Sequence, residues 1–259
     1  MTVGEVYDYI NTYAPFRLQD DFDNSGLLVG SRDTEVYRLA VCLDITNDIV
    51  EECERVGAQL IVSHHPVIFH KLARIDEHSP VYKLIKSDIA AICAHTNLDM
   101  VRGGISDLMY DMIGFGDPKN APVLHLIHPD KNIGYGRIAY LDFEISADGL
   151  AEKAKAAFGC QSIKYSDGGR SIKSVALSSG AGNDEVYNCI KMGIDAIITG
   201  DVKHHAFIDA RNAGVTVIDA GHYATENIIV GELIRKLSAH FPDADIFEPA
   251  ANAELCRYI

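Results

Sequence analysis

The sequence predicts an α/β protein made of two interlocked, pseudo-duplicated βαβ-containing halves, with a mostly parallel sheet and a short inserted α+β piece. Two stretches share one layout: an apolar strand, a helix that begins at Asn-Asp, a glycine and a second apolar strand. The Asn-Asp pair begins at Asn47 and the glycine is Gly57 in the first stretch, and the same features are Asn183 and Gly193 in the second. Units of this kind form parallel sheets with right-handed crossovers.

The likeness between the two stretches continues beyond the second strand of each. A further apolar strand follows, and it ends in His95-Thr-Asn-Leu-Asp99 in the first stretch and in His222-Tyr-Ala-Thr-Glu226 in the second. All parallel α/β proteins are somewhat self-similar, and this is the alternative explanation of the pattern. Equal spacing together with a shared His-x-x-x-acid ending favours a duplication, which would place both polar sites near a pseudo-twofold axis.

The predicted domain organisation follows from this repeat. A first α/β half covers residues 1–124, a short inserted α+β segment covers 125–170, and a second α/β half covers 171–259. The two halves should contain superposable cores at 38–113 and 172–237, in which Asn47 matches Asn183 and Asp99 matches Glu226. Inside the insert we expect a strand at 136–145, a helix at 147–158, a strand at 161–165 and a turn at 166–169.

The composition is that of an ordinary globular protein with a substantial core. Of 259 residues, 47% are hydrophobic and 23% are charged. The net charge of −14 disfavours nucleic acid and anionic membranes as partners, because both are polyanions. An anionic small-molecule substrate would therefore need a local positive centre, which bound metal ions can supply.

The cysteines and the beginning of the chain predict a cytoplasmic protein. The six cysteines include no Cys-x-x-Cys pair, so we expect reduced and mostly buried thiols. The first residues lack the basic and apolar regions of a signal peptide, and Thr2 with Glu5 resembles a helix capping box. No stretch is long and apolar enough to span a bilayer.

Polar clusters follow four of the predicted strands, and the carboxyl ends of parallel strands are where ligands gather. Of eleven histidines, six lie in these clusters. A single histidine is more often a surface or core residue, but four convergent clusters are harder to explain in that way. The clusters are Ser63-His64-His65-Pro66, His95 to Asp99, Gly200-Asp201-Val-Lys203-His204-His205, and His222 to Glu226.

His64 and His65 are adjacent, so within a strand they would point to opposite sides. Where the strand runs out into a loop, each can serve one of two neighbouring metal ions, and Pro66 favours an extended His65. The alternative is a polar strand end without a role in metal binding.

The two His-x-x-x-acid units suggest further metal ligands. If the helix predicted at 224–239 begins slightly early, His222 and Glu226 share one of its faces and can bind the same ion. The alternative is a histidine at a helix start followed by an acid that the helix dipole favours. Asp99 is the corresponding candidate in the first copy, where we expect residues 95–99 to form a loop before a helix at 106–113. His95 is a candidate ligand or proton carrier.

The candidate ligand set contains three imidazoles and two carboxylates, namely His64, His65, Asp99, His222 and Glu226. It lacks thiolates, which suits two divalent ions per chain of zinc, iron, manganese or cobalt and does not choose among them.

With these motifs the sequence resembles the Ngg-interacting-factor family, whose members are also called GTP cyclohydrolase I type 2 homologues. The resemblance implies that His65, Asp99 and Glu226 hold one ion and that His64, His222 and Glu226 hold the other. It also implies a ring-shaped homohexamer whose sites face an inner cavity. The motifs that carry it run in order along nearly the whole chain: Asn24-Ser-Gly-Leu-Leu-Val-Gly30, Ser63-His-His-Pro-Val-Ile-Phe69, Ala94-His-Thr-Asn-Leu-Asp99, Thr199-Gly-Asp201 with His204-His205, and Asp219-Ala-Gly-His-Tyr-Ala-Thr-Glu226.

For other polar residues in or near these motifs, a role in the site and a purely structural role are both possible interpretations. Asn24 either contacts substrate or forms a turn, and Lys203 either meets a phosphate or serves solubility. Asp201, His204 and His205 are candidates for orienting the ligand histidines or contacting the substrate, and the alternative is hydrogen bonding within a strand-end turn.

Three functions remain open from the sequence. The first is a metal-dependent hydrolase of a small molecule, in the cyclohydrolase version attacking the purine C8 of GTP and releasing formate, with His95 or His205 moving the proton. The second is a non-catalytic metal-binding or metal-delivery protein. The third is a protein-interaction scaffold that the metals stiffen.

Overall fold

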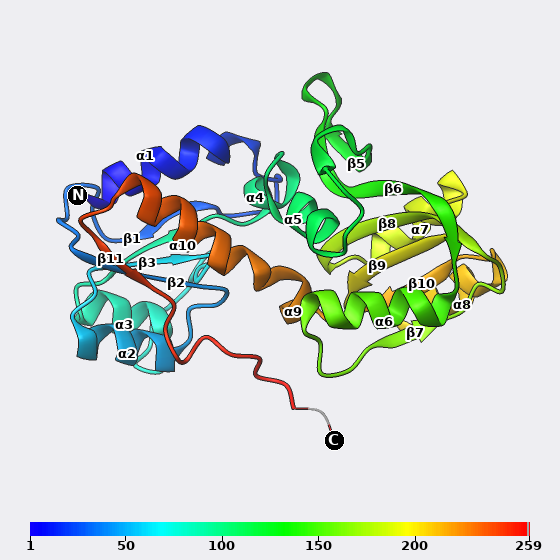
Figure 1. Ribbon diagram of the computed structural model, residues 1–259. Helices are drawn as coiled ribbons and strands as arrows, with labels where there is room; N and C mark the ends of the chain where they lie inside the picture. The colour runs from blue at the N-terminus through cyan, green and yellow to red at the C-terminus, as the bar shows by residue number, and fades with distance from the viewer. Residues whose placement is uncertain (258) are drawn as a thin grey trace. The chain divides into compact units, whose positions relative to one another are not determined.

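The computed structural model describes residues 1–257 and 259 and divides the chain into two compact units, each with one β-sheet (Figure 1). The first unit comprises Met1–Leu98 and Ile229–Leu255. The second comprises Asp99–Ile228, together with the described residues from Cys256 onward. The predicted α/β class is confirmed, with helices and strands alternating along most of the chain.

The first unit has a five-stranded sheet in the order β1-β4-β3-β2-β11, in which only β1 runs antiparallel to its neighbour. Its strands are β1 (Gly26–Val29), β2 (Arg38–Cys42), β3 (Leu60–Ser63), β4 (Ala90–Cys93) and β11 (Asp245–Phe247). Its helices are α1 (Val3–Tyr13), η1 (Phe16–Leu18), α2 (Asn47–Val56), α3 (Pro80–Lys86) and α10 (Ile228–His240).

Helices cover both faces of this first sheet (Figure 1). On one face α2 and α3 pack against the strands through a cluster that includes Ile49, Ile61 and Leu84. On the other face α1 lies beside α10, where the Tyr9 ring stacks on His240 and its hydroxyl donates to the Lys236 carbonyl over 3.2 Å. Two covered faces explain why strands of this sheet are continuously apolar in the sequence.

The second unit has a six-stranded sheet in the order β5-β6-β8-β9-β10-β7. Strands β8, β9 and β10 are parallel, whereas β5, β6 and β7 pair antiparallel. The strands are β5 (Val123–His128), β6 (Ile133–Ile145), β7 (Lys164–Ser166), β8 (Ile172–Ala181), β9 (Ala196–Gly200) and β10 (Thr216–Asp219). The helices are α5 (Ile105–Met112), η2 (Pro118–Asn120), η3 (Pro129–Lys131), α6 (Ala147–Phe158), α7 (Asn183–Met192), α8 (His204–Asn212) and α9 (His222–Glu226), and α4 (Thr96–Met100) spans the boundary between the units.

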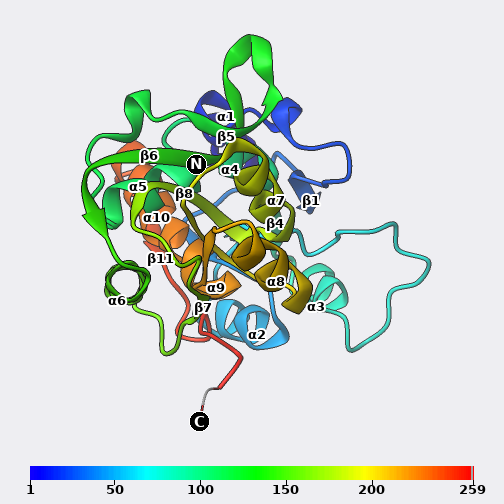
Figure 2. The ribbon, with the colours of Figure 1, turned by 90° about the vertical axis from the view of Figure 1, so that its right-hand side faces the viewer.

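Neighbouring residues of β6 show how this second sheet is packed. Ile138 belongs to the apolar cluster formed with α7 and α8, which Figure 2 shows on one side of the sheet. Arg137 points to the opposite face, because side chains alternate along a strand. There its guanidinium is fully buried and binds Asp107 of α5 and the carbonyls of Gly134, Gly136 and Val101.

Removing the partner of this buried guanidinium should destabilise the second unit strongly. Burial lowers the pKa of Arg137, and the Asp107 carboxylate counteracts that effect. We expect Asp107→Ala to lower the free energy of unfolding by about 3–5 kcal/mol, because it leaves an uncompensated buried charge. The control is Glu144→Ala, which breaks an exposed pair with Lys173 and should change stability little. Urea unfolding of both variants checks this, and equal small losses would contradict it.

The element-by-element correspondence expected from the repeat is present. Each unit contains a matching run of three parallel strands, in the orders β4-β3-β2 and β10-β9-β8, and β11 adds a fourth parallel strand to the first run. The helices α2 and α7 both have ten residues and both end at a glycine with φ of 70°, namely Gly57 and Gly193. The third strand of each set is followed by a five-residue helix, α4 or α9, which carries Asp99 or Glu226. Asp99 and Glu226 therefore occupy equivalent positions along the two copies.

The structure divides the chain differently from the predicted segments 1–124, 125–170 and 171–259. The chain leaves the first unit after Leu98 and returns to it at Ile229, so each unit contains one helix that follows a strand of the other: α5 follows β4, and α10 follows β10. Residues 125–170 are not a separate piece, because their strands β6 and β7 hydrogen-bond to β8 and β10 and extend the second sheet. The mostly parallel pairing predicted for the whole protein applies to the first sheet.

The loop predicted at residues 95–99 is wrong, because Thr96–Met100 form the helix α4. The Asp23 carboxylate accepts from the Thr96 backbone N–H and hydroxyl over 3.1 and 2.6 Å and so satisfies a donor at the start of this helix. A carboxylate so distant in the sequence leaves no local signal for the helix.

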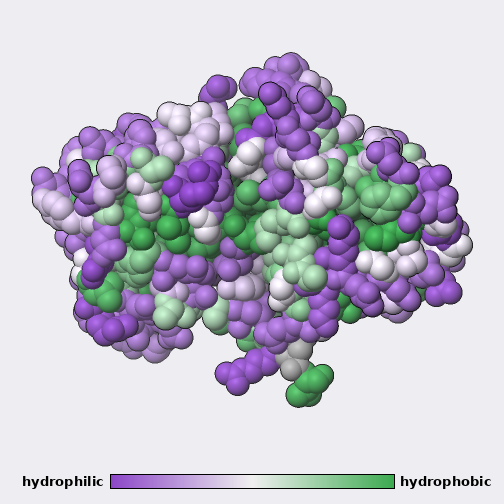
Figure 3. Space-filling view, in the orientation of Figure 1, coloured by the Kyte–Doolittle hydropathy of each residue, from purple (hydrophilic) through white to green (hydrophobic). Residues whose placement is uncertain are grey.

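Other expectations from the sequence are met. Thr2 and Glu5 form the capping box of α1. Cys42, Cys53, Cys93, Cys160 and Cys189 are buried free thiols and Cys256 is an exposed one; burial raises the pKa of Cys53 to about 12. In the described part of the chain, no helix has the length and apolarity needed to cross a membrane. Hydrophilic residues cover much of the face of the first unit seen in Figure 3.

Candidate metal centre

Two adjacent histidines follow β3 in the first unit. Their backbone N–H groups continue the ladder to the preceding strand, with His64 donating to the Cys42 carbonyl over 3.1 Å and His65 to the Leu43 carbonyl over 2.9 Å. His64 is fully buried, and its Nδ1 lies 2.8 Å from the Ala94 carbonyl oxygen. The Nδ1 atom of the half-buried His65 lies 2.7 Å from Asp44 Oδ1. Each ring is thus held by one nitrogen.

His95 joins these two rings from the end of β4. Its ring centroid lies 5.2 Å from that of His64 and 5.5 Å from that of His65. His64, His65 and His95 each offer one ring nitrogen, and these atoms all lie within 4.8 Å of one another. This group could hold a metal ion, since imidazole suits zinc, iron and related divalent metals.

Asp23 fixes His95 in place. Its carboxylate lies 2.8 Å from the His95 Nδ1 and also accepts from the hydroxyls of Thr96 and Ser25. Burial alone would raise the pKa of Asp23, but the hydrogen bond and charge of His95, with the two hydroxyls, hold that pKa well below its ordinary range. Asp23 is therefore ionised near neutral pH and orients the His95 ring.

In the second unit, α9 places His222 and Glu226 on the same face, as the sequence predicts. The His222 Nε2 lies 2.8 Å from Glu226 Oε2, and the Glu226 side chain is buried. The other ring nitrogen of His222, Nδ1, lies 2.8 Å from Asp201 Oδ2. Asp201 follows β9 with φ of 51°, a left-handed conformation that asparagine and aspartate adopt more readily than most residues.

Gly180 leaves room for the Glu226 carboxylate. A Cβ atom at this position would lie 2.1 Å from Glu226 Oε1 and 3.3 Å from His222 Nε2, and the φ of Gly180 is +60°. Its backbone N–H donates to the Thr225 hydroxyl over 3.0 Å, which ties the end of β8 to α9. Both the space and the backbone conformation require glycine here.

The four histidines share one arrangement. In His64, His65, His95 and His222 the Nδ1 atom faces an oxygen acceptor at 2.7–2.8 Å. In His64, His65 and His95 the acceptor at Nδ1 favours the tautomer with a proton on that nitrogen, so Nε2 carries the lone pair that binds a metal. His222 differs, because carboxylate oxygens of Asp201 and Glu226 face both of its ring nitrogens. The residues present therefore fit a divalent metal ion by donor chemistry and by ring orientation.

The remaining predicted site residues have different placements. Asp99 is buried in α4, four residues after His95. The Asn24 amide donates to the Ile68 carbonyl over 2.6 Å, so it links two loops of the first unit. Lys203 precedes α8 and His204 and His205 form its first residues, and all three are exposed.

Sequence reasoning missed Asp23, Asp44, Gly180 and Thr225. Asp44 lies two residues after the end of β2, as His65 does after β3, so the same rule about the carboxyl ends of strands would have found it. Asp23 and Thr225 reach the site through contacts far apart in the sequence and carry no such signal.

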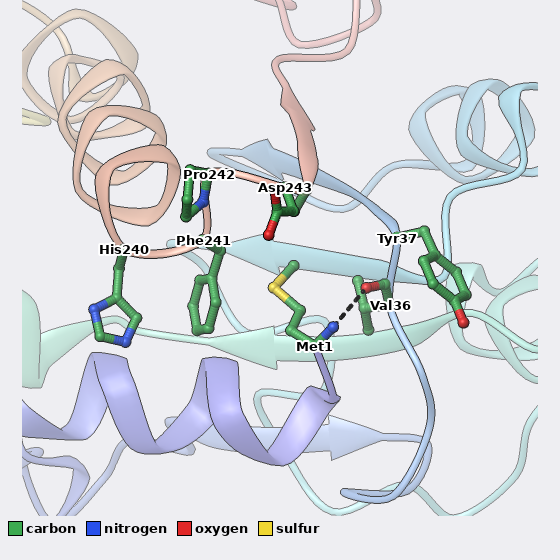
Figure 4. Close-up of a pocket in the computed structure, with 8 residues that line it drawn as sticks. Met1, Val36, Tyr37, His240, Phe241, Pro242 and Asp243 are labelled. Atoms are coloured by element: carbon green, nitrogen blue, oxygen red, sulfur yellow. Dashed lines mark hydrogen bonds between the residues drawn. The ribbon is translucent and has the colours of Figure 1, made fainter.

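A separate pocket of about 280 Å³ lies at the end of α10 in the first unit (Figure 4). Two of its lining residues are hydrogen-bonded, since Met1 N donates to the Val36 carbonyl over 3.3 Å. The described residues that line it are Met1, Val36, Tyr37, His240, Phe241, Pro242, Asp243 and Ala244, and none of these is a candidate metal ligand.

The fold and these side chains define an α/β protein with groups of histidines and carboxylates that could bind metal. The chain belongs to the Duf34/NIF3 (NGG1p interacting factor 3) family, whose profile matches residues 1–251. A Clostridium acetobutylicum protein named GTP cyclohydrolase 1 type 2 homolog is 34% identical, over 92% of this chain and 90% of its own length. A Helicobacter pylori protein named GTP cyclohydrolase 1 type 2 is 32% identical, over 91% and 93%. A Staphylococcus aureus crystal structure matches with a TM-score of 0.87 and 25% identity over 100% of this chain and 99% of its own.

Proposed function

We propose that this protein binds two divalent metal ions and hydrolyses a small molecule, with GTP as the first substrate to test. The observation that carries the proposal is the shared arrangement of His64, His65, His95 and His222, each with an oxygen acceptor at Nδ1. Related proteins named GTP cyclohydrolase 1 type 2 and its homologs supply the substrate class.

In the proposed ligand set, His65, Asp99 and Glu226 hold one ion and His64, His222 and Glu226 hold the other. Glu226 would be a ligand of both ions. Such ions, which would be zinc, iron, manganese or cobalt, supply Lewis-acid activation of the substrate and of water. Their charge would also give an acidic protein a local attraction for anions.

The protein's own side chains have separate roles in this proposal. Asp44, the Ala94 carbonyl and Asp201 orient the rings of His65, His64 and His222. His95 moves a proton, because its Nδ1 is held by the ionised Asp23 while its ring lies beside those of His64 and His65. The exposed Lys203, His204 and His205 are further candidates for contact with the substrate, with His205 as a second candidate proton carrier.

The experiment that tests this proposal is a formate-release assay with GTP on metal-replete protein. We expect formate from the wild type and a loss of at least about a hundredfold in His64→Ala, because a proposed metal ligand is removed. A panel of phosphoesters and cyclic amides follows if GTP is unchanged.

His125, which is more exposed than His64, offers a control for the loss of a histidine outside the proposed ligand set. Its Nδ1 also faces a carboxylate, Glu185 Oε1 at 2.9 Å, but it belongs to no proposed ligand set. His125→Ala should keep full activity. If His64→Ala is as active as His125→Ala, the ligand assignment is wrong. If nothing in the panel reacts while metal binding is tight, non-catalytic metal binding or delivery, or a protein-interaction scaffold, becomes the better explanation.

The ring-shaped homohexamer stays a prediction. Light scattering coupled to size-exclusion chromatography measures the mass of the assembly and decides it.

A further inference from the structure

Two exposed aromatic rings lie near each other in the first unit, and one of them lies beside His95. Phe22 is 60% exposed and Phe69 is 38% exposed, and their ring centroids are 6.3 Å apart. The Phe69 centroid lies 6.2 Å from that of His95, with the rings near perpendicular at 73°. Leaving large apolar rings in water forgoes the stabilisation that burial brings, so neighbouring exposed rings indicate a contact surface.

The loops that carry these rings are anchored to each other and to the residue after His95. Phe22 belongs to a loop in which the Asp20 N–H donates to the Thr96 hydroxyl over 2.9 Å. Phe69 belongs to the long segment between β3 and α3, residues 64–79, which extends outward from its sheet in Figure 2. Asn24 joins the two loops through its bond to the Ile68 carbonyl. Both rings are therefore positioned relative to the candidate site, although neither helps to form the core.

Exposed cationic residues follow Phe69 in the same segment. Lys71 and Arg74 are both exposed, in a chain whose net charge is −14. Asp20 and Asp21 stand before Phe22 and repel anions on that side. A ligand with an aromatic ring and an anionic group would thus direct its anionic group toward Lys71 and Arg74.

We propose that Phe22 and Phe69 form a stacking platform for the base of a nucleoside triphosphate, and that Lys71 and Arg74 bind its phosphates. This inference deepens the proposed function, because it assigns a nucleotide substrate to the same site. Aromatic stacking accepts any base, since every base has a π-face, so the platform explains binding of nucleotides as a class. Contact with the platform would bring the base beside His95, the proposed proton carrier.

Calorimetric titration of metal-replete protein with GTP, ATP and inorganic tripolyphosphate tests the platform without relying on turnover. Leucine replaces each ring in Phe22→Leu and Phe69→Leu, which keeps apolar bulk and removes the π-face. We expect each variant to bind GTP and ATP about tenfold or more weakly and tripolyphosphate as the wild type does. The double variant of Lys71→Ala and Arg74→Ala should bind all three more weakly. The control is Phe143→Leu, since Phe143 is also exposed, at 55%, but belongs to β6 of the second unit.

The platform would be overturned if the wild type bound neither nucleotide, or if both leucine variants bound nucleotides with unchanged affinity. It would also be overturned if the leucine variants lost equal affinity for nucleotides and for tripolyphosphate, or if they lost their bound metal. A smaller assembly with unchanged nucleotide affinity would assign the rings to contact with a second copy of the chain and would also overturn it. Base-dependent binding without hydrolysis would retain the platform and remove the proposed reaction. Hydrolysis of GTP that neither leucine change affects would retain the proposed reaction and remove the platform.

Discussion

Replacing Glu226 with alanine is expected to remove both metal ions from the protein. In the proposed ligand set this carboxylate is shared, so its loss takes a ligand from each ion. Its loss also deprives His222 of the oxygen that lies 2.8 Å from its Nε2. Elemental analysis of wild-type protein purified without chelator should approach about two transition-metal ions per chain, and the variant should contain well below one.

A second buried glutamate in the same unit gives the matched control. Glu185 is buried to a similar degree, with 7% exposure against 4% for Glu226, and it too pairs with a histidine, His125. Glu185→Ala should lose stability through an unpaired partner but keep its metal. A full metal complement in Glu226→Ala, or equal losses in both variants, would show that Glu226 does not bridge two ions.

Local patterns in the sequence were sufficient to predict much of the fold. The helix at 147–158 has the bounds of α6, because Ser146 caps it through the Gly149 N–H and Gly159 ends it in a left-handed conformation. The ten-residue helices α2 and α7 end at glycines in the same way. Signals of this kind lie within a few residues of the element that they define.

Long-range pairing could not be predicted in the same way. Strand β6 looks like part of an insert, yet Arg137 to Tyr140 pair with Leu177 to Ser174 in the second sheet. Each of α5 and α10 belongs to a different unit from the strand that precedes it in the chain. Helical periodicity shows that a helix has an apolar face, but it does not show which sheet that face packs against.

The candidate site shows the same difference between local signals, which the sequence contains, and long-range contacts, which it does not. Histidines and acids at the carboxyl ends of strands were predicted, since the rule that places ligands there needs only the order of elements. The groups that orient them were found only in part: Asp201 follows its strand directly, whereas Asp23 reaches His95 across 72 positions of the chain. Gly180 was not predicted as a site residue, because a glycine near a strand end usually indicates a turn or a bulge. Only the structure shows that the Glu226 carboxylate lies where a Cβ atom of residue 180 would be.

Replacing Gly180 with alanine is expected to abolish metal binding at Glu226 while leaving most of the fold intact. The new Cβ atom would lie 2.1 Å from Glu226 Oε1, far inside the contact distance of carbon and oxygen. The end of a glutamate side chain can rotate away at small cost, whereas the backbone at Gly180 is held by its bond to Thr225. The carboxylate should therefore move, and metal affinity should fall by at least about a hundredfold.

Gly193→Ala separates this steric effect from backbone strain. Gly193 has φ of +70°, close to the +60° of Gly180, but a Cβ atom there would meet nothing within 4 Å. Both variants should lose about 1–2 kcal/mol of stability in chelator, because an L-residue is strained in the left-handed region. Only Gly180→Ala should bind metal more weakly. Its thermal midpoint should therefore rise less than that of Gly193→Ala when metal is added, since a ligand stabilises the folded state by an amount that grows with the logarithm of its affinity. If both variants bind metal equally well, the Glu226 carboxylate is not a ligand in the position that the fold gives it. If both lose metal equally, backbone strain has disturbed the site from a distance, and the space at Gly180 has no special part in holding Glu226.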